Sequence, residues 1–143
     1  MDIIVGDCWY EAPQDPAGEW KRHIIRVDRK FDPLNYSDSF ACFADDFNGD
    51  GWVDVIVIPF PGNPCYWYEN PGAKGGPWKA HLLTNSACNE TPQYADLFGT
   101  GKRVIIMGFQ PKGKPGVDTE GQMAWFTPAK DPNAEWEMHP ISE

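Results

Sequence analysis

One short segment, DDFNGDGWVD at residues 45–54, places oxygen-bearing side chains at every second position around two glycines. Hard cations prefer carboxylate and amide oxygens as ligands, and Ca²⁺ takes six to eight oxygens at about 2.3–2.6 Å. A tight loop can direct its first, third and fifth residues inward, and Gly51 permits the sharp turn that must follow the third ligand. The sequence therefore predicts a calcium site in this loop. Its predicted ligands are Asp46, Asn48, Asp50, Asp54 and, through the main-chain carbonyl, Trp52.

The same residues also suit an Asx-rich turn without a cation, because Asn and Asp bond their own backbone and Gly supplies positive φ. A later segment, DLFGTGKRV at residues 96–104, keeps Asp96 and Gly101 but adds Lys102 and Arg103. The remaining ligand positions hold Phe98, Thr100 and Val104. With two carboxylates lost and two cations added, we expect no calcium there and a turn held by hydrogen bonds.

The loop belongs to a unit that recurs along the chain. The segments WKRH, WKAH and WEMH begin at Trp20, Trp78 and Trp136, 58 residues apart. WYEAP, WYENP and WFTP begin at Trp9, Trp67 and Trp125 with the same step. The apolar runs DIIVG, DVIVI and VIIMG recur at a similar distance, and CFADDF is followed later by QYADLF. Such periods are typical of repeat architectures.

Each unit contains four short apolar runs, rich in β-branched and aromatic residues and bounded by turn residues. This pattern predicts an all-β fold, a β-propeller of four-stranded blades. A β-sandwich is the alternative, but it has no reason to repeat bulky motifs at equal spacing. We expect residues 1–143 to form one partial propeller. It would consist of an incomplete blade at 1–28 that lacks its inner strand, a blade at 40–83 and a blade at 91–141.

Propellers close with four to eight blades, so nearly three blades leave the ring open. We therefore expect a homo-oligomer, in particular a dimer, or association with the remainder of a longer propeller chain. The net charge of −9 argues against a nucleic-acid partner, since such binding depends on Lys and Arg. No apolar run approaches the length of a membrane span. The four cysteines show no zinc spacing, and we expect free thiols.

The loop DFNGDGWVD, followed by YWYENPG and WKAHLL, resembles the FG-GAP repeats of integrin α-subunit propellers and, more specifically, bacterial VCBS-type repeats. This resemblance implies calcium as cofactor and an extracytoplasmic or secreted location, although no signal peptide is visible in this chain. In such propellers the calcium turns lie on one face, and protein or glycan partners use the other. The expected ligand-binding residues on that other face are Tyr36, Asp38, Phe60, Asn63, Asn89, Glu90 and Gln110.

His23, His81 and His139 occupy the same place in successive units, so we expect them to lie apart and to serve packing. The Trp20, Trp78 and Trp136 series should pack blade against blade. No motif of a known enzyme class is present, and we predict no catalytic residues. The sequence favours a calcium-binding module that serves as a scaffold for protein or glycan partners. The alternatives are the propeller part of a carbohydrate-active enzyme, of lyase or dehydratase type, and a self-assembling propeller fragment with no further ligand.

Overall fold

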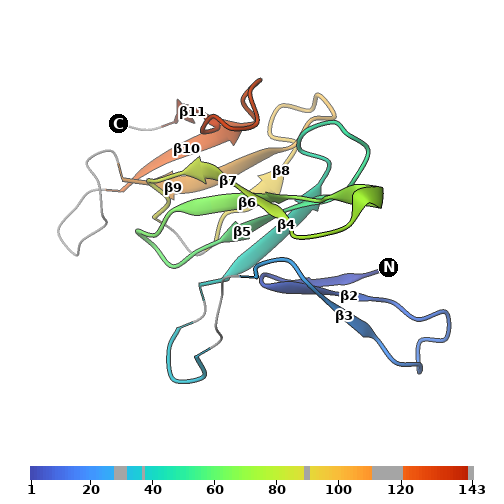
Figure 1. Ribbon diagram of the computed structural model, residues 1–143. Helices are drawn as coiled ribbons and strands as arrows, with labels where there is room; N and C mark the ends of the chain where they lie inside the picture. Colours follow the sequence, from blue (N-terminus) through green and yellow to red (C-terminus); the bar gives the residue numbers. More distant parts are fainter. Residues whose placement is uncertain (28–31, 37, 89–90, 111–120, 142–143) are drawn as a thin grey trace.

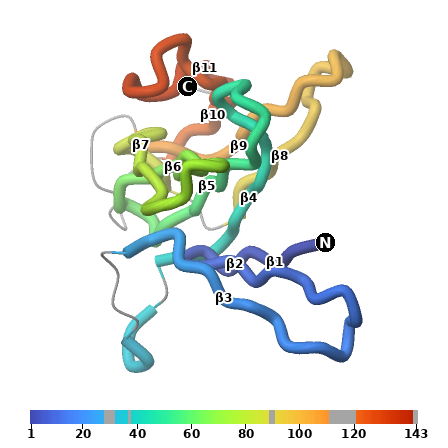
Figure 2. The backbone as a smooth tube through the Cα atoms, turned by 45° about the vertical axis from the view of Figure 1, so that its right-hand side comes forward, coloured from blue at the N-terminus to red at the C-terminus, as the bar shows by residue number. Residues whose placement is uncertain are grey.

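The computed structural model of the chain describes residues 1–27, 32–36, 38–88, 91–110 and 121–141. Its strands form three antiparallel sheets, as expected for an all-β chain, and the described part contains no α-helix. The sheets follow one another in space, with the middle sheet between the other two (Figures 1 and 2). They do not close into a ring.

The middle sheet has the strand order β4-β5-β6-β7. Its strands are β4 (Ala41–Asp45), β5 (Asp54–Ile58), β6 (Cys65–Glu69) and β7 (Lys79–Thr84), with a short 3₁₀ turn, η1 (Gly72–Lys74), between the last two. All five residues of β5 are buried, because this β-branched run is covered on both faces of the sheet.

The third sheet repeats this order with β8 (Gln93–Ala95), β9 (Val104–Phe109), β10 (Gln122–Thr127) and β11 (Glu137–Pro140). The first sheet has three described strands, β1 (Ile3–Val5), β2 (Cys8–Glu11) and β3 (Lys21–Ile24). Strand registers show that the sheets are copies of one unit, since Ile4 faces Trp9, Ile56 faces Trp67 and Ile106 faces Trp125. Among the described residues, the first sheet has no counterpart of β4 and β8.

Two apolar clusters hold the sheets together. The larger cluster joins the middle and third sheets and includes Ile56, Trp67 and Leu83 on one side and Met107 and Phe126 on the other. The smaller cluster joins the first and middle sheets and is built from Ile25, Val55, Val57 and Tyr68, with Ile4, Trp9 and Trp78 packed against them. The core of this chain therefore lies between blades, as in a propeller.

The predicted packing role of the Trp20, Trp78 and Trp136 series can be followed at two of its members. Trp78 packs in the junction between the first and middle sheets, and Trp136 is buried in the junction between the middle and third sheets. The Trp136 N–H also donates to the carbonyl of Leu83 at 3.0 Å. Trp20 is half-buried on the first sheet.

Candidate functional sites

The loop between β4 and β5 is closed by one carboxylate at its first position. Oδ1 of Asp46 accepts hydrogen bonds from the N–H groups of Gly49 and Asp50, at 2.8 and 3.0 Å. Its Oδ2 accepts from the N–H of Gly51 at 2.9 Å. Gly49 and Gly51 have φ of 77° and 89°, a region that side chains disfavour, so both glycines are needed for this turn.

The third and fifth positions of the loop bond to each other. Oδ1 of Asn48 accepts from the N–H of Asp50 at 3.0 Å, and Nδ2 of Asn48 donates to Oδ2 of Asp50 at 3.1 Å. Oδ1 of Asp50 accepts from the N–H of Trp52 at 2.8 Å. The oxygen-bearing side chains at the first, third and fifth positions thus gather over one tight loop.

The ninth position is the most enclosed part of the loop. Asp54 is fully buried at the start of β5. Its two oxygens accept from the N–H groups of Phe47, at 3.1 Å, and Asn70, at 2.9 Å. The pKa of Asp54 is raised to about 6, mainly by burial and in smaller part by the charges of Asp50 and Asp46, although the two N–H groups lower it. The base of the loop therefore holds a carboxyl group whose negative charge is poorly compensated.

The donor chemistry of the loop fits Ca²⁺, because its side chains offer carboxylate and amide oxygens. Its present arrangement is that of an Asx-rich turn. Among the described residues, no group of three Asp, Glu, His or Cys side chains is placed to hold a metal ion. A cation here would therefore share its carboxylates with the main-chain N–H groups, and it would also draw on the amide oxygen of Asn48 and on main-chain carbonyls.

The indole of Trp52 lies across the 3₁₀ turn η1, at the end of β6. A Cβ added to Gly72 would meet Nε1 of Trp52 at 2.6 Å, and the φ of Gly72 is 59°. Asn70 supports this contact, since its Nδ2 donates to the carbonyl of Val53 at 3.0 Å and its Oδ1 accepts from the N–H of Gly72 at 2.9 Å. The loop and the turn thus hold each other in place, and Trp52 remains about half exposed.

The corresponding loop of the third sheet keeps only the closing carboxylate. Asp96 accepts hydrogen bonds from the N–H groups of Thr100, at 2.9 Å, and Gly101, at 2.7 Å. The N–H groups of Gly101 and Thr100 lower the pKa of Asp96 below its ordinary value. Gly99 and Gly101 have positive φ, like their counterparts in the middle blade. Hydrogen bonds hold this turn, as the sequence suggests.

The repeated histidines stack on the repeated tryptophans of their own sheets. His81 lies 4.2 Å from Trp67, measured between ring centroids, and its Nε2 is 2.7 Å from Oε2 of Glu69. The first sheet repeats the arrangement with Trp9, His23 and Glu11, and in the third sheet His139 stacks on Trp125 and contacts Thr127. The three histidines form no common site. The sequence signal for these contacts is a Trp-x-Glu segment followed by histidine twelve residues after the glutamate.

Four of the expected ligand-binding residues lie together at the opposite end of β5. Oδ1 of Asp38 accepts from the N–H of Phe60 and from Nδ2 of Asn63, each at 2.9 Å. Phe60 also contacts Tyr36, with 5.8 Å between the ring centroids. A cavity of about 150 Å³ lies beside them between the first and middle sheets. It is lined by Arg26, Asp38, Val57, Pro59, Asn63, Pro64, Tyr66 and Tyr68.

The other expected ligand residues do not join this group. Gln110 is buried at the end of β9, where its N–H donates to the carbonyl of Ser86 at 2.9 Å. Asn89 and Glu90 lie outside the described residues. Arg26, which the sequence analysis did not single out, also lines the cavity. Its guanidinium is 3.4 Å from Asp7 and 4.0 Å from Asp38 and lies over the ring of Tyr68.

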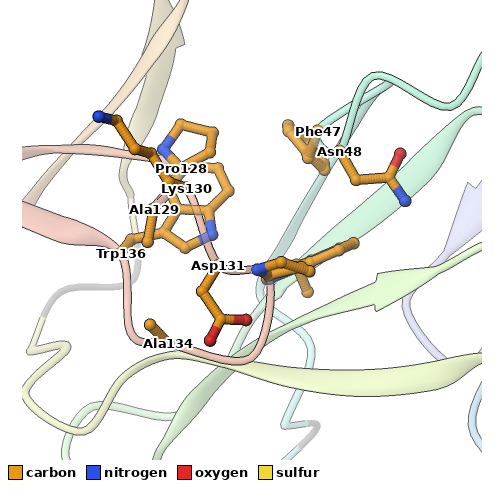
Figure 3. A pocket seen from close by; sticks show the side chains of 10 residues that line it. Phe47, Asn48, Pro128, Ala129, Lys130, Asp131, Ala134 and Trp136 are labelled. Carbon is orange, nitrogen blue, oxygen red and sulfur yellow. The ribbon is translucent and has the colours of Figure 1, made fainter.

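A second cavity, of about 90 Å³, lies between the middle and third sheets on the side of the loop 46–54. Figure 3 shows Phe47 and Asn48 on one side of it and Trp136 with the segment 128–131 on the other. Trp67 also lines this cavity, and its buried Nε1 has no hydrogen-bond partner. This cavity could not be predicted from the sequence, because its walls come from segments about 80 residues apart.

Comparison with known protein families gives one match, which covers the loop 46–54 and the strands that follow it. Residues 46–107 match the family model of the FG-GAP-like repeat. These residues are an FG-GAP-type repeat. The match begins at the acidic loop of the middle sheet and ends in β9, so this FG-GAP repeat contains both the loop 46–54 and its altered counterpart at residues 96–104. No curated protein and no solved structure matches the chain.

The FG-GAP repeat, the stacked antiparallel sheets and their common register fit a β-propeller, which confirms the predicted fold class. The four cysteines are free thiols, as expected. Within the described residues, no helix has the length and apolar character needed to cross a membrane.

Proposed function

We propose that this chain is a calcium-dependent β-propeller module that binds a protein or glycan partner. The observation that carries the calcium part is the loop 46–54. Its side-chain oxygens gather over one turn, and a buried, poorly compensated carboxyl group, that of Asp54, lies at its base. The hydrogen bonds that reach this carboxyl group come from main-chain N–H groups, which carry no full charge. A divalent cation would supply the missing positive charge.

Calcium would be held by Asp46, Asn48 and Asp50, with Asp54 and the carbonyl of Trp52 completing the site. When bound, it would crosslink the loop to the start of β5. Because Asn70 already links Asp54 and Val53 to the turn after β6, the loop, β5 and η1 would be fixed as one unit. An extracytoplasmic location agrees with this proposal, since extracellular calcium modules bind at about 10⁻⁴–10⁻³ M.

The experiment that tests the calcium part is thermal denaturation with and without millimolar CaCl₂. A ligand that binds only the folded state stabilises it by RT ln(1 + [L]/Kd), so the melting temperature should rise with calcium. Asp50→Ala should remove most of that rise. Thr100→Ala, at the same position of the third loop, should leave it unchanged. An equal calcium response in the wild type and Asp50→Ala would refute the assignment.

The partner site is proposed at the opposite end of β5, where Asp38 and Asn63 line the cavity of about 150 Å³. Phe60 is hydrogen-bonded to Asp38 and contacts Tyr36, so these two rings lie next to the cavity. Tyr36 and Phe60 are exposed, and an exposed aromatic ring offers a stacking surface for a sugar or an apolar side chain. A glycan array probed with the wild type and with Tyr36→Ala tests the glycan form. Signals that survive Tyr36→Ala unchanged would place glycan binding elsewhere.

A further inference from the structure

Each sheet of this chain presents two different faces. We call the face that contains the repeated tryptophan the Trp face and the opposite one the Tyr face. The Trp faces contain Ile4, Trp9 and Ile25 in the first sheet, Ile56, Trp67 and Leu83 in the middle sheet, and Ile106, Trp125 and Ile141 in the third. The Tyr faces contain Ile3, Val5 and Tyr10, then Val55, Val57 and Tyr68, then Ile105, Met107 and Phe126.

The chain builds the same junction twice. Between the first and middle sheets, Ile4, Trp9 and Ile25 of one Trp face pack on Val55, Val57 and Tyr68 of the next Tyr face. Between the middle and third sheets, Ile56, Trp67 and Leu83 pack in the same sense against Ile105, Met107 and Phe126. A Trp face therefore always receives the Tyr face of the sheet that follows it.

Within the part of the chain that the structure describes, no sheet covers the Tyr face of the first sheet or the Trp face of the third sheet. On the first sheet, Val5 of the Tyr face is 56% exposed, whereas its counterpart Val57 is 3% exposed. On the third sheet, Ile141 of the Trp face is 56% exposed, whereas its counterpart Leu83 is fully buried. The apolar side chains at both ends are thus of the types that the internal junctions bury, at the same register positions. Exposed apolar surface of this kind marks an interaction site.

We propose that these two open faces bind each other between copies of the chain, with the Trp face of the third sheet on the Tyr face of the first sheet of a second copy. The second copy is the occupant because each chain carries both halves of a junction that it already forms twice. The contact joins two different surfaces, so it is head-to-tail. Two copies would close on themselves through two such junctions, with six sheets in the ring, within the range in which propellers close. This proposal does not depend on calcium.

The test is sedimentation analysis of the 143-residue chain at about 100 µM. The wild type should sediment at twice the chain mass of 16.1 kDa. Val5→Lys changes only the Tyr face of the first sheet, and Ile141→Lys changes only the Trp face of the third. Each variant alone should be monomeric, since a charge then lies in both junctions of the closed pair. Leu34→Lys, at a residue 93% exposed outside both faces, is the matched control and should dimerise like the wild type.

Mixing the two variants distinguishes the head-to-tail contact from a symmetric one. The Ile141 face of Val5→Lys and the Val5 face of Ile141→Lys are both intact, so an equimolar mixture should form a one-to-one complex through one junction. In a symmetric contact, only one variant would dissociate and mixing would restore nothing. Circular dichroism should show that both variants remain folded. A second pair of variants is Ile3→Lys, on the Tyr face of the first sheet, and Met123→Lys, on the Trp face of the third sheet two residues before Trp125 in β10. A monomeric wild type, or a mixture that stays monomeric, would overturn the proposal and assign these faces to another protein or to further blades.

Discussion

Leu83 and Ile141 occupy the same place in successive sheets, and truncating each to alanine should have very different effects on the isolated chain. Leu83 is fully buried between the middle and third sheets, beside Trp67 and Trp136, whereas Ile141 is 56% exposed. A buried leucine replaced by alanine loses about 2–5 kcal/mol through lost burial and the cavity left behind. A substitution at an exposed position changes the free energy of unfolding by about 0.5 kcal/mol or less.

Urea denaturation, followed by tryptophan fluorescence, measures the difference. At roughly 2 kcal/mol per M of urea, Leu83→Ala should lower the midpoint by about 1–2.5 M. Ile141→Ala should leave it almost unchanged at low micromolar protein, where copies of the chain are dissociated. At high concentration the Ile141→Ala effect should grow as the junction between copies forms. Equal losses for the two variants in dilute protein would show that the junction between the middle and third sheets, where Leu83 is buried, is not the core of the molecule.

Three further predictions concern single residues. The melting temperature of Asp96→Ala should lie below that of the wild type above pH 5, and the gap should shrink as the pH falls below about 4. The reason is that a carboxyl group whose folded pKa is lowered stabilises the protein only while it is ionised; a gap that is constant with pH would contradict this. Gly72→Ala should cost more stability than Gly75→Ala in urea denaturation. Both positions have φ near 60°, and this backbone conformation costs a residue with a side chain about 1–2 kcal/mol. Only at Gly72 would the new Cβ also meet Trp52. Equal losses of stability in the two variants would therefore show that Trp52 does not lie against Gly72. Cys65 should react with a thiol reagent far more slowly than Cys88 in the native protein, because burial raises the pKa of Cys65 to about 12; equal labelling rates by mass spectrometry would contradict its burial.

The fold was predictable from the sequence because each unit carries its own large, conspicuous residues. The 58-residue step of Trp20, Trp78 and Trp136 reflects one blade, and the Val- and Ile-rich runs reflect its second strand. The closing role of Asp96 was also visible, since a turn that keeps its aspartate and glycine but loses the other oxygens must rely on hydrogen bonds. Features confined to one unit can be read from local spacing.

Features formed between units were not predictable in this way. The buried position of Gln110 beside Ser86 depends on how two sheets approach each other, and the cavity next to Trp67 depends on a loop from the third sheet. Contacts between two turns of one unit were not predictable either, as in the middle unit, where Trp52 of the loop 46–54 meets Gly72 in the turn that follows β6. Sequence spacing assigned Trp52 a carbonyl ligand but could not show that its indole braces this turn.

The most direct test of the proposed calcium loop is isothermal titration of Ca²⁺ into chelator-treated protein. One site per chain is expected, with a Kd of about 10⁻⁴–10⁻³ M, which Asp50→Ala abolishes and Asp96→Ala leaves intact. Absence of binding in the wild type would leave the loop 46–54 as an Asx-rich turn and contradict its assignment as a calcium site. A second site lost in Asp96→Ala would contradict the distinction between the two loops.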